Sequence, residues 1–182
     1  LLPKDHIANK EYQKFLDKFG EEGNLVVIGF QDHEFFTPKN YAAWNELMTG
    51  LKKSREVDLV VSLNDLKKLE KDTINEKFVL KPFIDQSKTL DPAYLKEIQY
   101  DLFHNLPFYE GLLFNKKSGS VRSAIYINKK LVNTAERKTF ILENLVPKID
   151  KFEKTTGIDL KVSGMPYIRT INANDMKGEI GL

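Results

Sequence analysis

The sequence has no cysteine and no long apolar run, and each absence limits what the chain can do. Without cysteine, disulfide bonds and thiolate catalysis are excluded, which suits an oxidising compartment without requiring one. The longest apolar stretch, residues 25–30, is the length of a strand. A membrane helix needs about 20 apolar residues in succession. We therefore expect no membrane span within the chain.

An excess of either charge is also absent. The 28 Lys and Arg residues nearly balance the 26 Asp and Glu residues, for a formal net charge of +2, and the two signs are interspersed. Binding of RNA to a sheet would need aromatic side chains on its central strands, and the region around residues 119–126 offers only Tyr126. We expect no nucleic-acid partner.

Common catalytic and metal-binding motifs are missing as well. His6, His33 and His104 do not stand at the spacing of a metal site. No glycine-rich phosphate loop, Gly-x-Ser-x-Gly or His-Glu-x-x-His motif occurs. Asp32 and Glu34 follow the first predicted strand, where their charge would repel a phosphate. We expect no enzymatic activity and no cofactor.

The first 64 residues predict a helix followed by a strand–helix–strand unit. Apolar residues at helical spacing indicate a helix at 7–19, and the apolar run at 24–31 is typical of a central strand, covered on both sides or deep within a sheet. Thr37 and Pro38 indicate the start of a second helix. Residues 57–63 predict the next strand. The apolar face of the second helix consists of Tyr41, Trp44, Met48 and Leu51.

The chain from residue 109 predicts a second unit of the same plan. Residues 109–114 and 120–128 indicate a hairpin whose turn is closed by Gly119. Residues 158–163 alternate between apolar and polar side chains, as in a strand with one buried face.

Between these strands the sequence predicts a helix. Asn133, with Glu136 three residues later, resembles a capping box. The helix should end at Gly157 and be kinked or restarted at Pro147.

Two such units in tandem predict an α+β fold, the ferredoxin-like βαββαβ split sandwich, with two helices on one face of an antiparallel sheet. Residues 65–108 form an insertion between strands two and three, too long to be a structureless loop. Asp91 and Pro92 open a helix there, so we expect a mainly helical insertion that packs onto the domain. The whole chain is then one domain, with residues 1–64 and 109–182 as its two halves.

Aromatic residues gather in and beside the insertion. Four of them are candidates for an apolar substrate cleft between insertion and sheet, and ordinary core packing is the alternative. They are Phe83, Phe108, Tyr109 and Phe114.

Four segments resemble the first large extracytoplasmic loop of RND-type (resistance-nodulation-division) transporters. They are LLPKDH (1–6), FGEEGNLVVIGFQ (19–31), LPFYEGLLFNKKSGSVRSAIYI (106–127) and SGMPYIRT (163–170). The chain is most similar to the lipid-exporter-like MMPL branch, related to the hopanoid exporters and to Patched and Dispatched. In that family the loop lies between the first and second transmembrane helices, and its porter subdomain has the βαββαβ plan. Both ends of this chain are therefore expected to lead into membrane helices.

The resemblance implies a periplasmic domain of a proton-driven exporter of hydrophobic or amphiphilic molecules, at the inner membrane of a bacterium. Its partners would be the membrane helices and second periplasmic loop of the same transporter, and further copies of the pump in a homo-oligomer. Pro166, Tyr167 and Arg169 would lie where the last strand passes to the second membrane helix, and would transmit motion; an ordinary turn is the alternative. The alternative function is a free-standing periplasmic module that binds lipid or another hydrophobic ligand.

Overall fold

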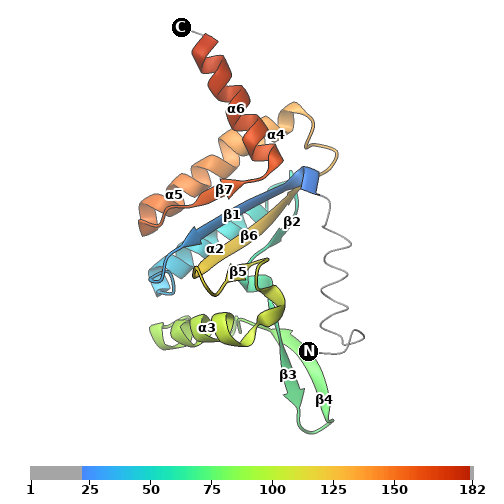
Figure 1. Cartoon of the computed structure of the whole chain (residues 1–182), viewed down its shortest axis with the longest axis vertical. Coiled ribbons are helices and arrows are strands. Elements are labelled where there is room, and N and C mark those ends of the chain that lie inside the picture. Colours follow the sequence, from blue (N-terminus) through green and yellow to red (C-terminus); the bar gives the residue numbers. More distant parts are fainter. Residues whose placement is uncertain (1–21, 181–182) are drawn as a thin grey trace.

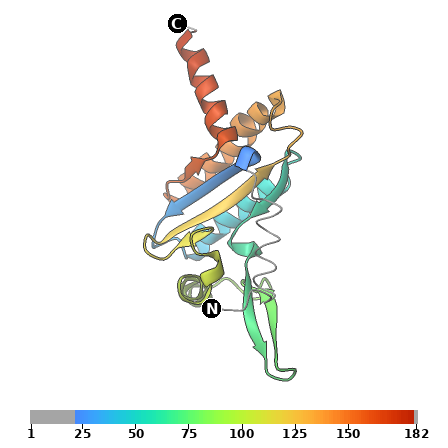
Figure 2. The ribbon, with the colours of Figure 1, turned by 45° about the vertical axis from the view of Figure 1, so that its right-hand side comes forward.

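The computed structural model describes residues 22–180 and shows an α+β fold built on an antiparallel sheet (Figures 1 and 2). The strands lie in the order β2–β6–β1–β7, and the short β5 pairs with the start of β6. The predicted helix at 7–19 lies outside the described residues. The strands of this sheet are β1 (Leu25–Gln31), β2 (Val57–Val61), β5 (Phe114–Asn115), β6 (Ser120–Ile127) and β7 (Lys161–Ser163).

The first strand lies inside the sheet, between β6 and β7, as its apolar run predicted. Successive side chains of a strand point to opposite faces. Val26, Ile28 and Phe30 are buried on one face of β1, while Leu25, Val27 and Gly29 are half-buried on the other.

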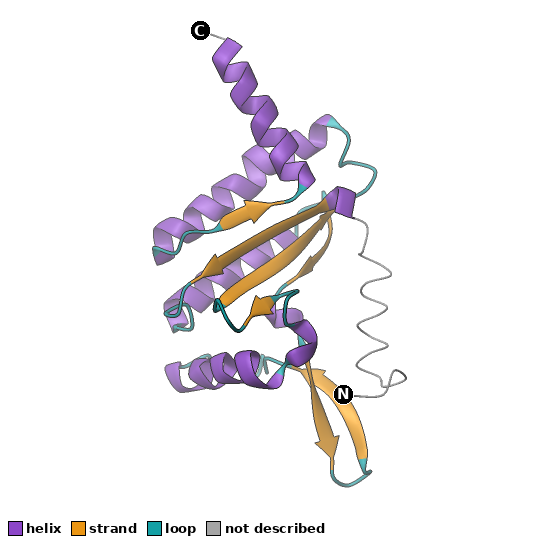
Figure 3. Ribbon diagram, in the orientation of Figure 1, coloured by secondary structure: helices purple, strands orange, loops and turns teal. Residues whose placement is uncertain are grey.

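Helices α2 (Pro38–Lys52) and α5 (Val146–Thr156) lie side by side on the buried face of the sheet (Figure 3). The start of α2 is confirmed, because the Thr37 hydroxyl accepts a hydrogen bond from the N–H of Asn40. All four residues of its predicted apolar face are buried. The Trp44 ring meets Phe30 of β1 and Phe152 of α5 edge-on, with centroids 5.2 and 5.7 Å away. This contact joins sheet and helices in one core.

The helix predicted from residue 133 is present with one correction at its start. It runs through α4 (Ala135–Thr139), the π-helical segment η4 (Phe140–Leu145) and α5, and ends at Gly157 with φ 75°, as predicted. The cap is Thr134, whose hydroxyl accepts from the N–H of Glu136 at 3.2 Å. The prediction of Asn133 as the cap was wrong by one residue. Asn133 and Thr134 are both of the types that cap helices well, so the sequence does not distinguish them.

Pro147 explains the π-helical segment. Proline has no N–H, and in a regular α-helix its ring would collide with the carbonyl four residues earlier, that of Glu143. The preceding turn is wider instead, and the N–H of Val146 bonds to the carbonyl of Ile141, five residues back. The helix therefore restarts near Pro147 without breaking.

The insertion contains a β-hairpin as well as the predicted helix, so the expectation of a mainly helical insertion was wrong. After the short η2 (Leu63–Asp65), β3 (Lys67–Asp72) and β4 (Lys77–Pro82) pair as a separate two-stranded sheet. Helix α3 (Pro92–Asn105) begins at the predicted Asp91 cap. The insertion packs onto the domain as predicted, because its apolar residues belong to the same core as the sheet.

The predicted strand at 109–114 is mostly a turn. Residues Pro107–Tyr109 form the 3-10 segment η3, and only Phe114–Asn115 pair with β6. Gly119, with φ 67°, closes the connection as predicted.

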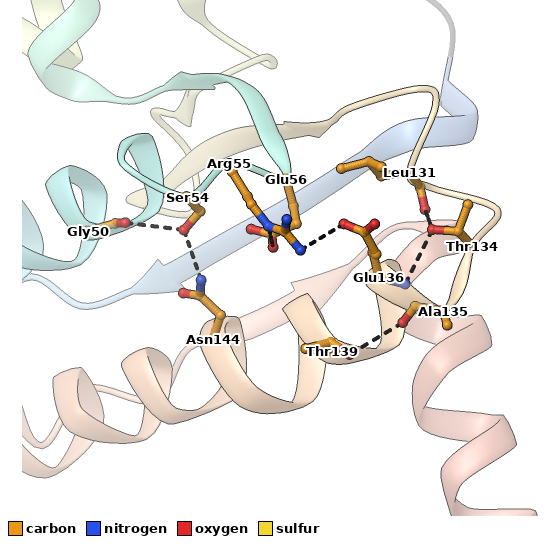
Figure 4. A network of polar contacts seen from close by, with 10 residues as sticks. All are labelled: Gly50, Ser54, Arg55, Glu56, Leu131, Thr134, Ala135, Glu136, Thr139 and Asn144. Carbon is orange, nitrogen blue, oxygen red and sulfur yellow. Dashed lines mark hydrogen bonds and ion pairs between the residues drawn. The ribbon is translucent and has the colours of Figure 1, made fainter.

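A set of polar contacts ties the end of α2 to the α4–η4 helix (Figure 4). The Asn144 amide donates to the Ser54 hydroxyl at 3.0 Å, and Ser54 donates to the Gly50 carbonyl at 3.3 Å. Arg55 bridges Glu56 and Glu136, at 3.0 Å each. Exposed ion pairs are weak in water, so these contacts chiefly fix how the two helices meet.

Helix α6 (Met165–Ile180) and the β3–β4 hairpin project at opposite ends of the molecule's long axis (Figures 1 and 2). Helix α6 continues to Ile180, the last residue that the structure describes. Among residues 22–180, none of the helices has both the length and the apolar character that a bilayer crossing requires.

Candidate functional site

A cleft of about 640 Å³ lies between the base of the hairpin, the following loop and α3. A backbone hydrogen bond closes the base of the hairpin: the N–H of Phe83 donates to the Leu66 carbonyl at 2.8 Å. The Tyr94 hydroxyl on α3 accepts from the N–H of Asp85 at 2.9 Å. The cleft therefore depends on the hairpin and α3 packing together. Its apolar lining consists of Leu66, Pro82, Phe83, Ile84 and Ile98.

Charged groups of both signs surround this apolar floor. Glu70 on β3 pairs with Lys81 on β4 at 2.6 Å and with Lys68 at 3.6 Å. The hydrogen bond to Lys81 lowers the pKa of Glu70 and raises that of Lys81, so both stay charged at neutral pH. The rim contains the cations Lys67, Lys68, Lys81 and Lys88 and the acids Asp65, Glu70, Asp85, Glu97 and Asp101. Since neither sign dominates, the rim does not select strongly for charge.

The four aromatic residues predicted for a substrate cleft do not gather in this one. Phe83 lies in its floor and is 3% exposed. Phe108 and Tyr109 are half-buried in η3, where the Tyr109 hydroxyl accepts from the N–H of Lys67 at 3.3 Å. Phe114 is buried in the core and packs edge-on against Phe103, with centroids 5.8 Å apart.

A partly buried chain of hydrogen bonds fixes the start of the insertion at one wall of the cleft. The Tyr41 hydroxyl donates to the side-chain oxygen of Asn64, and the Asn64 amide donates to Asn45 at 2.6 Å. Burial raises the pKa of the Tyr41 hydroxyl, so it remains a donor at any physiological pH. Asn64, which lines the cleft, is thereby held in one orientation.

The second candidate region is the passage from β7 to α6. Gly164 makes the turn with φ 112°. Pro166 is buried in the first turn of α6, and its carbonyl accepts from the Thr170 hydroxyl at 2.8 Å. Tyr167 is half-buried against the core, and Arg169 is exposed. The three residues predicted to couple the domain to a membrane helix thus lie in the first turns of α6 and face different surroundings.

Residues 22–180 contain no cluster of three or more potential metal ligands. In the loop after β1 the Asp32 carboxylate accepts from the N–H of Glu34 at 2.7 Å, which forms a local turn.

Comparison of the sequence with protein-family models and with curated proteins found no match.

Proposed function

We propose that this chain is a porter-type domain of an RND-type exporter of the lipid-exporter-like MMPL branch, at the periplasmic face of a bacterial inner membrane. The order of the strands in the sheet is the observation that most supports this proposal. In the order β7–β1–β6–β2, the strands of each strand–helix–strand unit are separated by a strand of the other unit. This interleaving, with both helices on one face, supports the ferredoxin-like βαββαβ topology that the resemblance implies for a porter subdomain.

In this proposal the domain acts without catalysis. Porter domains move substrate by opening and closing clefts against their neighbours, a hinge-type change. The insertion cleft, with Phe83 in its floor, is one surface that would meet substrate or a neighbouring loop. Arg169, whose side chain is exposed, would meet the membrane-proximal parts of the transporter, because α6 projects from the domain (Figure 1). Tyr167, half-buried against the core, would pass movement of the helix to the domain.

The sequence around this domain in its gene tests the assignment. We expect a long apolar helix within about 30 residues of each end, each with roughly 20 apolar residues. The free-standing ligand-binding module requires a signal peptide upstream and a polar segment downstream. Polar flanks on both sides would overturn the transporter assignment.

Efflux of a hydrophobic fluorescent dye from cells that carry the parent protein tests the role of α6. The variant Arg169→Ala should retain dye, at an unchanged protein level, because this exposed side chain no longer contacts the rest of the transporter. Lys96→Ala, an exposed change on α3, is the control and should export normally. Normal export by Arg169→Ala would refute a coupling role for this residue.

A further inference from the structure

A row of three residues across β6, β1 and β7 forms a notch on the sheet face opposite α2 and α5. Gly29 is in register with Arg122 on one side and with Lys161 on the other. Neighbouring strands are about 4.8 Å apart, so the backbones of Arg122 and Lys161, two strands apart, are about 10 Å from each other. Gly29 lies between them and has no side chain. The notch encloses about 260 Å³.

Gly29 is required for this shape. A Cβ at this position would lie 3.1 Å from Cγ of Arg122 and 3.0 Å from the Val121 carbonyl oxygen. Glycine inside a strand often marks a place where another group approaches the backbone closely. Here it lets the stem of Arg122 lie against β1.

The notch is positively charged, unlike the insertion cleft. Arg122 forms no ion pair with any residue in 22–180. Lys161 pairs with Asp159 at 2.5 Å, and both side chains are largely exposed. The remaining polar lining residues are Gln31, Ser120 and Ser163, so the lining contains no carboxylate. An anionic oxygen group would find two cations and two hydroxyls here.

The neighbouring row on the same face is apolar except at its β7 end, where Ser163 is in register with Val27. Val27 lines the notch and is in register with Ala124, which is in register with Val61. Leu25 and Leu59 continue this face and are half-buried. A molecule whose charged end occupies the notch would therefore place an apolar chain against Val27.

We propose that this notch holds the anionic headgroup, a carboxylate or phosphate, of an amphiphilic substrate. The inference rests on the proposed function for its role in transport, and deepens it by naming the substrate class. Arg122 supplies the main attraction and Lys161 a smaller one, because Lys161 already has a partner in Asp159.

Binding is measured on the full chain, labelled with ¹⁵N, by NMR titration with dodecanoate. Saturable shifts are expected at the amides of Gly29, Arg122 and Lys161. Arg122→Gln should weaken binding about tenfold, since charge-assisted hydrogen bonds are lost, and Lys161→Gln should weaken it less. Lys96→Gln, at an exposed cation on α3, is the control and should leave the affinity unchanged.

Three results would overturn the inference. They are equal affinity for wild type and Arg122→Gln, equal binding of uncharged dodecyl maltoside at these amides, and saturation by acetate or inorganic phosphate at the concentration that dodecanoate requires. The notch and the proposed function can fail independently. Membrane helices in the flanking sequence without dodecanoate binding would refute only the notch as a binding site. Dodecanoate binding with polar flanks would refute only the transporter assignment.

Discussion

Replacing Gly164 by alanine tests how α6 is joined to the domain. A Cβ on Gly164 would lie 2.2 Å from the carbonyl oxygen of Leu25, and φ at this position is 112°. A residue other than glycine in such a conformation costs about 1–3 kcal/mol. The clash adds to this, because the opposing atom belongs to the backbone of β1 and cannot rotate away. We expect Gly164→Ala to lower the free energy of unfolding by about 3 kcal/mol, which corresponds to roughly 6–12 °C in Tm.

Urea unfolding followed by fluorescence measures this loss, since Trp44 is the only tryptophan and is fully buried. Gly178→Ala is the matched control in the same helix, where a Cβ would meet nothing within 4 Å. Alanine is favoured over glycine inside a helix by about 1 kcal/mol, so the control should be neutral or slightly stabilising. A Gly164→Ala protein as stable as wild type would show that the close approach to β1 is absent.

The remaining predictions concern a cap, two buried serines and a carboxylate. Thr37→Ala should lower the free energy of unfolding by about 1 kcal/mol in urea, because α2 loses its cap. In the same assay Ser123→Ala should be neutral or stabilising, since the buried Ser123 hydroxyl has no hydrogen-bond partner within residues 22–180. Ser62→Ala should cost about 1–2 kcal/mol, because the Ser62 hydroxyl donates to Asp65 at 2.9 Å; equal effects of the two serine changes would contradict this assignment. Hydrogen bonds from Asn75 lower the pKa of Asp72 from its ordinary 3.8, so the stability that they contribute is present above pH 3.8 and is lost as the pH falls through the folded pKa. The NMR shift of the Asn75 amide should follow this titration. Asp72→Asn should abolish the pH dependence of that shift.

Elements whose ends are determined by neighbouring residues could be predicted from the sequence. Thr37 and Asp91 cap helices because a side-chain oxygen meets an N–H three residues later, and a proline follows each. Gly119 and Gly157 have positive φ as expected. These interactions lie within a few residues of each other, so the local sequence contains all of the information.

The hairpin of the insertion could not be predicted in this way. Strand β3 consists almost entirely of lysine and acidic residues, and β4 has three consecutive apolar residues between two lysines; none of these side chains is fully buried. The alternating apolar pattern that indicates a strand is therefore absent. Backbone pairing between the strands holds the hairpin together instead, and cross-strand contacts such as the exposed Glu70–Lys81 ion pair add a little. Because the cleft depends on the hairpin, its charged rim could not be predicted either.

The notch was hidden for a different reason. Gly29, Arg122 and Lys161 come from three distant parts of the chain, and only the register of β6, β1 and β7 brings them into one row. A shift of one residue in either pairing would turn a cation to the opposite face. Sequence alone does not specify such a register.

The packing of α6 decides how the domain can respond to movement of that helix. Its first turns are fixed to the body: the Thr170 hydroxyl accepts from Arg137 of α4 at 3.2 Å, and Tyr167 and Ile171 pack against the core. Gly164 meanwhile lies against the backbone at the start of β1. A force on the exposed part of α6 would therefore act on β7, β1 and α4 together rather than bend the chain at Pro166. Since β7 and β1 also form the notch, displacement of α6 would change the spacing of Lys161 and Gly29 before it changed the insertion cleft at the far end of the molecule.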